Sequence, residues 1–132
     1  MFSIGKSSIR LCSAFAIATT LFASGVDAAG DPAAGKAAYA ARCAACHSMD
    51  YNGTGPAHRG VFGRKAGAAP GFAYSAALAR AKVVWSEGTL DRWLTNPEKF
   101  LPGQKMGVSV PEAKLRADLI AYLKSESTQP RE

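Results

Sequence analysis

The sequence predicts a small all-α domain of three to five helices joined by long loops. Three observations lead to this class. Helix-start signals precede several segments, apolar residues recur at helical spacing near the C-terminus, and glycine and proline fill the stretches between. No run alternates apolar and polar residues as a strand would, and no internal repeat is present.

The first predicted helix begins with Asp31-Pro32 and runs to Arg42. The aspartate can cap the helix, proline suits its first position, and most of the residues that follow are strong helix formers. Residues 48–72 are then rich in glycine and proline, which predicts a loop. A loop of this length in a small domain is expected only where the chain wraps around something.

Two helices are predicted in the middle of the chain. A short alanine-rich segment follows Ser75, and Ser86 can cap a longer helix that ends at Asn96-Pro97. The apolar residues of this longer helix are Leu90, Trp93 and Leu94.

The last helix is predicted to start at Pro111-Glu112, after a second loop over residues 100–110. Its apolar side chains fall on one stripe and are Leu115, Leu119, Tyr122 and Leu123. The predicted helices are too few and too short to close a core alone, so something apolar is expected to fill the middle.

Residues 1–28 read as an export signal. Lys6 and Arg10 give a basic start, residues 11–23 are mostly apolar, and Val26-Asp27-Ala28 is a small-residue cleavage pattern. The apolar run is shorter than the ~20 residues of a spanning helix, and an uncleaved anchor is the alternative. We therefore expect a signal peptide over 1–28, a single domain over 29–132 and a periplasmic location without stable membrane insertion.

The mature chain is moderately basic. Without Lys6, Arg10 and Asp27, the 16 basic and 10 acidic residues of the chain fall to 14 and 9. This charge suits an acidic partner protein or an anionic membrane face. The basic residues are scattered and no nucleic-acid-binding motif is present, so no nucleic-acid partner is expected.

The pentapeptide Cys43-Ala44-Ala45-Cys46-His47 carries the chemistry. Cys12 leaves with the signal, and a disulfide between the two remaining cysteines would close too short a loop to add much stability. Cys-x-x-Cys-His is the attachment motif of c-type haem. Thiols one helical turn apart can bond the two vinyl groups, and His47 can then bind the iron. One covalently attached haem c per chain would also supply the missing core.

Two other uses of the cysteines are less consistent with the sequence. A structural zinc site needs four ligands, and besides the pentapeptide only His58 is available. A thioredoxin-like redox pair is expected beside a strand-helix-strand unit, which the sequence does not predict.

The sixth iron ligand decides between an electron carrier and a reactive haem. Met1 leaves with the signal and Met49 is tethered to the His47 side, so Met106 is the remaining methionine. Proline and glycine in its loop can turn the thioether inward. Core filling is the alternative for such a methionine, and His58 is a further candidate ligand that would keep electron transfer at a lower potential.

Longer stretches of the chain resemble the class I c-type cytochromes, in particular mitochondrial cytochrome c and its soluble bacterial relatives. The similarity covers nearly all of residues 30–124, in the family order and near its spacing. The matching blocks are GDPAAGKAAYAARCAACH, TGP, VFGRKAGAAPGFAYS, NPEKFLPGQKM and RADLIAYLK. The resemblance implies the class I fold, wrapped around one haem. It also implies that Met106, in the family's PG-x-K-M block, is the sixth ligand.

The same resemblance implies further haem contacts. Pro56 matches the residue whose carbonyl accepts a hydrogen bond from the proximal histidine. Arg64, Tyr74 and Trp85 match the groups around the haem propionates, and their donors suit a buried carboxylate. For Tyr74 and Trp85, ordinary aromatic packing in the core is the alternative.

Two residues of the first helix, Gly35 and Tyr39, match the family positions that cross the last helix. There they would meet Leu119 and Tyr122. A glycine at such a crossing lets the two helix axes approach closely.

The chain departs from the family near the haem. Its loop after His47 is shorter, and His58 stands where an apolar residue is usual. Trp93 replaces the usual tyrosine near the methionine sulfur. Gly107-Val108-Ser109 replaces a segment with an aromatic residue, so the haem edge is expected to be less covered.

The predicted docking face also departs from the family. Arg42, Lys99 and Lys105 match basic positions around the haem edge, whereas Glu98 and Glu112 stand where lysines are common. The face is therefore expected to be less positive than its mitochondrial counterpart, which affects encounter rate and partner choice more than affinity.

Taken with the resemblance, these features predict a soluble, monomeric periplasmic electron carrier rather than an enzyme. It would shuttle single electrons from a bc1-type complex or a periplasmic dehydrogenase to a terminal oxidase, reductase or peroxidase, as in a respiratory chain. The rival is a haem enzyme or gas-binding protein whose sixth site is open or labile.

Overall fold

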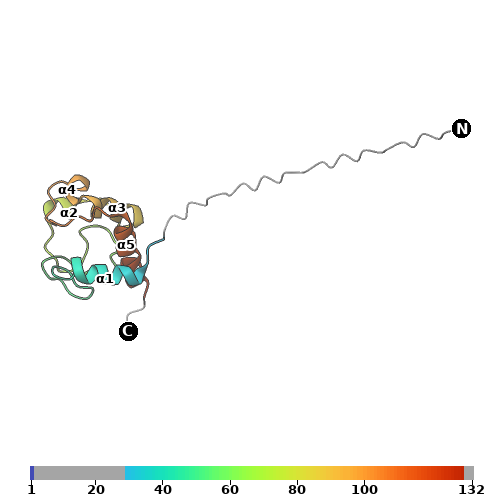
Figure 1. Cartoon of the computed structure of the whole chain (residues 1–132). Coiled ribbons are helices and arrows are strands. Elements are labelled where there is room, and N and C mark those ends of the chain that lie inside the picture. Colours follow the sequence, from blue (N-terminus) through green and yellow to red (C-terminus); the bar gives the residue numbers. More distant parts are fainter. Residues whose placement is uncertain (2–28, 130–132) are drawn as a thin grey trace.

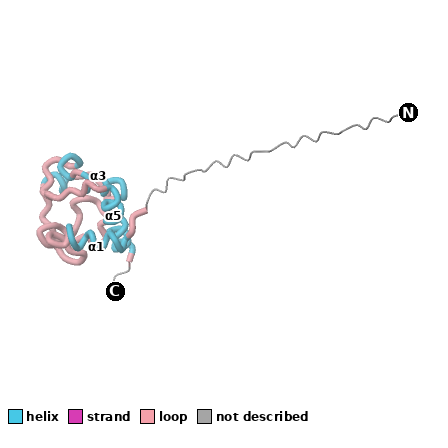
Figure 2. Tube along the Cα trace, viewed as in Figure 1, coloured by secondary structure: helices cyan, strands magenta, loops and turns pink. Residues whose placement is uncertain are grey.

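The computed structural model describes Met1 and residues 29–129, so the predicted signal peptide lies outside the described residues apart from Met1. Five helices follow in order (Figure 1): α1 (Pro32–Arg42), α2 (Ala76–Arg80), α3 (Glu87–Thr95), α4 (Pro97–Phe100) and α5 (Ala113–Thr128). Loops make up much of the rest (Figure 2), with one isolated bridge between Lys65 and Val84. The all-α class and the predicted number of helices are confirmed for the described residues. None of the helices described is both long and apolar enough to cross a membrane.

Local capping signals set the starts of the first three helices. Asp31 accepts a hydrogen bond from the amide of Ala33 at 2.8 Å, and proline occupies the first position of α1. Ser75 caps α2, and Ser86 forms a reciprocal capping box with Thr89 at the start of α3. These caps satisfy amides that have no partner within the helix, so the predicted starts are confirmed.

Helix α4 is absent from the sequence-based prediction, which treated Asn96-Pro97 only as a stop. Asn96 has an extended backbone, as expected for a residue before proline, and this ends α3. Its side chain also accepts a hydrogen bond from the amide of Lys99 at 2.9 Å, while Pro97 occupies the first position of α4. The same two residues therefore end one helix and start the next.

Helix α5 begins two residues later than predicted, at Ala113. The carbonyl of Pro111 accepts a hydrogen bond from Nη1 of Arg116 at 2.7 Å, so Pro111 belongs to the preceding turn. Along the predicted stripe, Leu119, Tyr122 and Leu123 are buried and Leu115 is half-buried.

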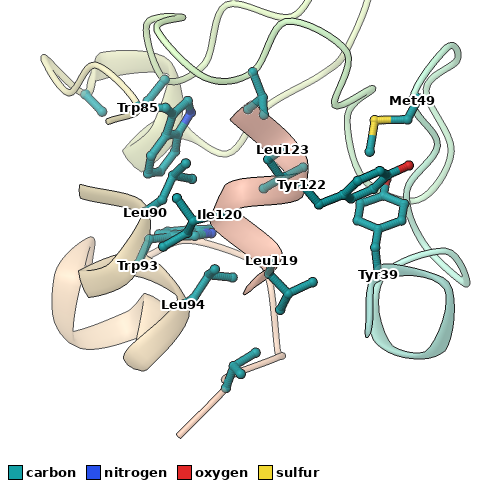
Figure 3. Close-up of a cluster of buried hydrophobic side chains, with 14 residues drawn as sticks. Tyr39, Met49, Trp85, Leu90, Trp93, Leu94, Leu119, Ile120, Tyr122 and Leu123 are labelled. Atoms are coloured by element: carbon teal, nitrogen blue, oxygen red, sulfur yellow. The ribbon is translucent and has the colours of Figure 1, made fainter. Parts of the chain in front are cut away.

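The predicted crossing of α1 and α5 is present and close. A Cβ on Gly35 would lie 2.6 Å from the carbonyl carbon of Asp118 and 2.8 Å from Cβ of Tyr122. Next to this point, the rings of Tyr39 and Tyr122 meet edge to face with centroids 5.5 Å apart (Figure 3). Only a residue without a side chain allows the two backbones to approach this closely.

A second cluster joins α3 to α5. Trp93 and Leu94 lie on one side of α5, near Ile120, and the Tyr39–Tyr122 pair lies on the other (Figure 3). An ion pair between Nε of Arg116 and Asp91, at 2.7 Å, ties the same two helices together. Helix α5 is therefore packed against α1 on one side and α3 on the other.

The helix crossing makes a stability prediction. We expect Gly35→Ala to lower the free energy of unfolding of the haem-containing protein by at least about 2 kcal/mol, because the added methyl must push the two backbones apart. Denaturant titration followed by circular dichroism measures this loss.

Gly88→Ala is the matched control. A Cβ at Gly88, near the start of α3, would meet no atom within 4 Å, so this change should be neutral or stabilise by about 0.5–1 kcal/mol. Equal stability of Gly35→Ala and the parent would contradict the close crossing.

Candidate functional site

A mostly apolar cavity of about 440 Å³ lies inside the ring of helices and loops. This volume falls within the ~300–1,000 Å³ of typical ligand sites. All eight candidate site residues predicted from the sequence line it, and these are Cys43, Cys46, His47, Pro56, Arg64, Tyr74, Trp85 and Met106. Residues from distant parts of the chain thus face one space.

The pentapeptide forms a tight turn at the end of α1. The amides of Cys46 and His47 both donate to the carbonyl of Cys43, at 3.0 and 2.9 Å. The two cysteines form no disulfide; Cys43 is half-buried and Cys46 is exposed. Burial raises the pKa of the Cys43 thiol to about 11, so without haem this thiol is protonated at neutral pH and a weak nucleophile.

The His47 ring is held through Nδ1, which lies 2.8 Å from the carbonyl oxygen of Pro56. A carbonyl can only accept, so Nδ1 carries the proton and Nε2 keeps its lone pair for a metal. Burial lowers the pKa of His47, and the hydrogen bond to Pro56 opposes this shift. The neutral imidazole with a free Nε2 is the form that iron binds.

Gly55 lies against one face of the His47 ring. A Cβ on Gly55 would sit 2.6 Å from both Nδ1 and Nε2, well inside van der Waals contact. The position therefore requires glycine for its lack of a side chain. The sequence signals this only as part of a turn motif, so its contact with the imidazole was missed.

His58 stacks on the same imidazole. The ring centroids of His47 and His58 are 4.0 Å apart with planes 19° from parallel, and Nδ1 of His58 lies 3.1 Å from the hydroxyl of Tyr39. Burial lowers the pKa of His58 to about 3, with His47 and Arg64 acting in the same direction, so His58 is neutral. Its place beside His47 is incompatible with a role as ligand on the opposite side of the iron.

Arg64 offers a test of whether the cavity suits an anionic cofactor. Its Nη1 and Nη2 donate to the carbonyls of Arg59 and Ala57, at 3.1 and 2.8 Å. Its Nε is buried and has no hydrogen-bond partner. A buried unpaired donor is costly, and a carboxylate such as a haem propionate would satisfy it. The cavity wall therefore fits haem.

Tyr74 and Trp85 have packing partners as well as a place on the cavity wall. The hydroxyl of Tyr74 accepts from the amide of Ala69 at 3.1 Å, and its ring lies 4.9 Å from that of Phe72. Trp85 is 7% exposed, and its ring centroid lies 5.4 Å from that of Trp93. The aromatic-core alternative for both residues therefore stays open.

Met106 is presented by the loop after α4. The carboxylate of Glu98 accepts from the amide of Gly103 at 3.0 Å and from Nε2 of Gln104 at 3.2 Å. The side chain of Gln104 turns toward Met106, and its Oε1 accepts a hydrogen bond from the backbone amide of Met106. This bracing by Glu98 and Gln104 was missed, since the sequence marks Glu98 only as an acid where lysine is common.

The described residues do not support a zinc site. Nowhere in residues 29–129 do three His, Cys, Asp or Glu side chains converge as metal ligands. Haem attachment thus remains the use of the two cysteines that fits their surroundings.

Comparisons with known proteins show which family the chain resembles. The cytochrome c family model matches residues 32–127. Cytochrome c of Chlamydomonas reinhardtii is 49% identical over 102 residues, covering 73% of this chain and 89% of that protein. Two solved structures are similar: cytochrome cH from Methylobacterium extorquens (TM-score 0.70, 45% identity, 73% of this chain and 99% of that one), and cytochrome c2 from Rhodospirillum centenum (TM-score 0.69, 36% identity, 74% and 99%). The expected class I fold is confirmed.

The contact between Gly55 and His47 makes a prediction about the haem-containing protein. Gly55→Ala should destabilise it by about 1–3 kcal/mol, because the methyl must displace the imidazole or the loop. On acidification, protons compete with the iron for Nε2 of His47. A weaker bond between His47 and the iron is therefore broken at a higher pH. The acid transition from low-spin to high-spin ferric haem should therefore shift to higher pH by about one unit for each ~1.4 kcal/mol lost from the bond. Absorption spectra along a pH titration measure it.

Gly107→Ala is the control for this change. A Cβ there would meet nothing within 4 Å, and the residue follows Met106 on the other wall of the cavity. Its acid transition should match the parent. An unshifted transition in Gly55→Ala would show that the imidazole tolerates the methyl.

Proposed function

The chain belongs to the cytochrome c family, and from this membership we propose that it is a soluble periplasmic protein that shuttles single electrons through haem iron held by His47 and Met106. Members of the family are electron carriers rather than enzymes, and each chain carries one covalently attached haem c. The observation that carries this proposal is that both cysteines, His47 and Met106 line one cavity.

The attachment residues have distinct roles in this proposal. Cys43 and Cys46 would hold the haem through thioethers, and His47 and Met106 would bind its iron. Bound haem supplies the one-electron couple of its iron. The hydrogen bond from Nδ1 of His47 to Pro56 orients the imidazole and makes it a stronger donor. A neutral thioether as the second ligand raises the reduction potential.

The propionate side of the cofactor is assigned to Arg64, Tyr74 and Trp85. The unpaired Nε of Arg64 supports this assignment, because it is a buried donor on the cavity wall. The mostly apolar lining keeps water away from the iron. Exclusion of water limits the reorganisation that each electron transfer requires.

Partners are proposed to meet the exposed face around Arg42 and Lys105. Both residues are exposed and line the cavity, so they lie where the cofactor edge would approach solvent. Donors would be a bc1-type complex or a periplasmic dehydrogenase, and acceptors a terminal oxidase, reductase or peroxidase. Such encounters use small, weak interfaces, which suits a monomer that must leave as readily as it arrives.

The ligand assignment makes a spectroscopic prediction. Ferric protein should show the weak near-red absorption band of methionine sulfur bound to haem iron, and Met106→Ala should lose it. Met49→Leu is the control. Met49 is buried and does not line the cavity, so the near-red band of this variant should match that of the parent. No band in the parent would reject Met106 as the ligand.

Carbon monoxide separates the carrier from its rival. Reduced parent protein should bind carbon monoxide slowly or not at all, because the thioether occupies the sixth position, whereas reduced Met106→Ala should bind it rapidly. Stopped-flow absorption measures both rates. Rapid binding by the parent would favour a haem enzyme or gas-binding protein with a labile sixth site.

The predicted signal peptide is tested by the mass of the mature protein. Expressed in a bacterium with a haem-attachment system, the chain should appear in the periplasmic fraction with the mass of about residues 29–132 plus one haem. Intact mass spectrometry of that fraction measures this. Full-length chain in the membrane fraction would instead support the uncleaved anchor.

A further inference from the structure

Two groups pack closely against the imidazole of His47. Gly55 lies so close to the ring that even a methyl group would overlap it, and the ring of His58 stacks on it at 4.0 Å. Its edge is held by the bond from Nδ1 to Pro56 at 2.8 Å. Three separate contacts from one short loop, residues 55–58, therefore surround a single side chain.

The edge contacts alone do not fix the plane of an axial imidazole. The Cβ–Cγ bond, the hydrogen bond at Nδ1 and a bond from Nε2 to iron all lie at the edge of the ring and in its plane, so each permits some rotation of that plane. A flat group pressed against the face resists this rotation, because turning the ring would force the two surfaces apart. Of the surrounding groups, His58 presents such a flat surface, with planes only 19° from parallel.

His58 is itself held in place from outside the loop. Its Nδ1 lies 3.1 Å from the hydroxyl of Tyr39 in α1, and the two rings meet edge to face at 5.7 Å. Tyr39 is 7% exposed and packs in turn against Tyr122 of α5 (Figure 3). A continuous series of contacts therefore leads from the α1–α5 crossing through Tyr39 and His58 to the face of His47.

We propose that His58 is a positioning residue that fixes the plane of the His47 imidazole, and that the Tyr39 hydroxyl holds His58 in that place. The inference rests on the proposed function in one respect, that His47 is the proximal ligand. An aliphatic side chain at position 58 would fill the same space without a flat surface or a bond to Tyr39. Since the imidazole of His58 is neutral, it achieves this without placing a positive charge beside the iron.

Three variants separate the stacked ring from the hydrogen bond. His58→Phe keeps a flat ring and loses the bond, His58→Asn keeps an acceptor near Tyr39 and loses the ring, and His58→Leu loses both. Tyr39→Phe removes only the hydroxyl. Ile120→Val is the control for general loosening, because Ile120 is a buried core residue that does not line the cavity.

The first readout is the set of haem methyl proton shifts in ferric protein, whose order and spread depend on the plane of the axial imidazole. We expect His58→Phe and the Ile120→Val control to keep the parent pattern, and His58→Asn and His58→Leu to change it. Tyr39→Phe should give a smaller change in the same direction, because the ring of His58 remains but is no longer held.

The second readout is solvent exchange of the Nδ1 proton of His47 in the ferrous protein. Loss of the covering ring in His58→Leu should speed this exchange by at least about tenfold, because opening of the loop becomes easier. Exchange in Ile120→Val should be close to that of the parent.

The outcomes are distinguishable from failure of the proposed function. Absence of the near-red band in the parent would reject Met106 as the ligand, and absence of a low-spin ferric spectrum would reject the proposed haem ligation. Both spectra are measured on the parent before any variant is made. With those present, a parent methyl pattern in His58→Asn and His58→Leu would overturn the inference. So would an equal change in Ile120→Val. If the His58 variants fail to fold, Tyr39→Phe decides, and an unchanged pattern there would overturn the holding role of its hydroxyl.

Discussion

The crossing of α1 and α5 is the contact on which both walls of the cavity depend. Gly35 lets the backbones meet, and α1 then ends in the turn that presents Cys43, Cys46 and His47. In α5, the second helix of the crossing, Arg116 donates hydrogen bonds to the carbonyls of Val110 and Pro111, where the Met106 loop ends. One helix pair therefore fixes His47 directly and anchors the far end of the Met106 loop.

The two walls are held with different strength. On the His47 side, the hydrogen bond to Pro56 and the stack on His58 involve half-buried residues, and unmade hydrogen bonds cost more where water is excluded. On the distal side, the bonds from Glu98 to Gly103 and Gln104 are exposed, and such bonds contribute only about 0.5–1.5 kcal/mol each. Gly107 and Val108 next to Met106 are exposed as well. If the cavity opens, it opens first on the methionine side.

Sequence predicted the local features well and the long-range ones only where a motif carried them. Asp31, Ser75 and Ser86 act on amides two or three residues away, so their capping roles are readable from neighbours alone. Asn96-Pro97 carries two signals at once, and the starting signal for α4 was missed. The stacking of His58 on His47 could not be predicted, because it depends on how the loop over 48–57 returns to the proximal side. The assignment of residues 1–28 to a signal peptide stays a prediction.

Glu98 shows how structure changes the reading of a surface charge. In the sequence it stands only as an acid on a face where lysines are common. In the fold its carboxylate is occupied by the amide of Gly103 and the side chain of Gln104, which in turn holds the amide of Met106. Its negative charge therefore stays close to the methionine loop, beside the exposed Lys99 and Lys105. Because this charge offsets part of the positive field there, partner encounter should depend less on ionic strength than for a face of lysines alone. Bracing of the Met106 loop and weaker electrostatic steering thus follow from one residue.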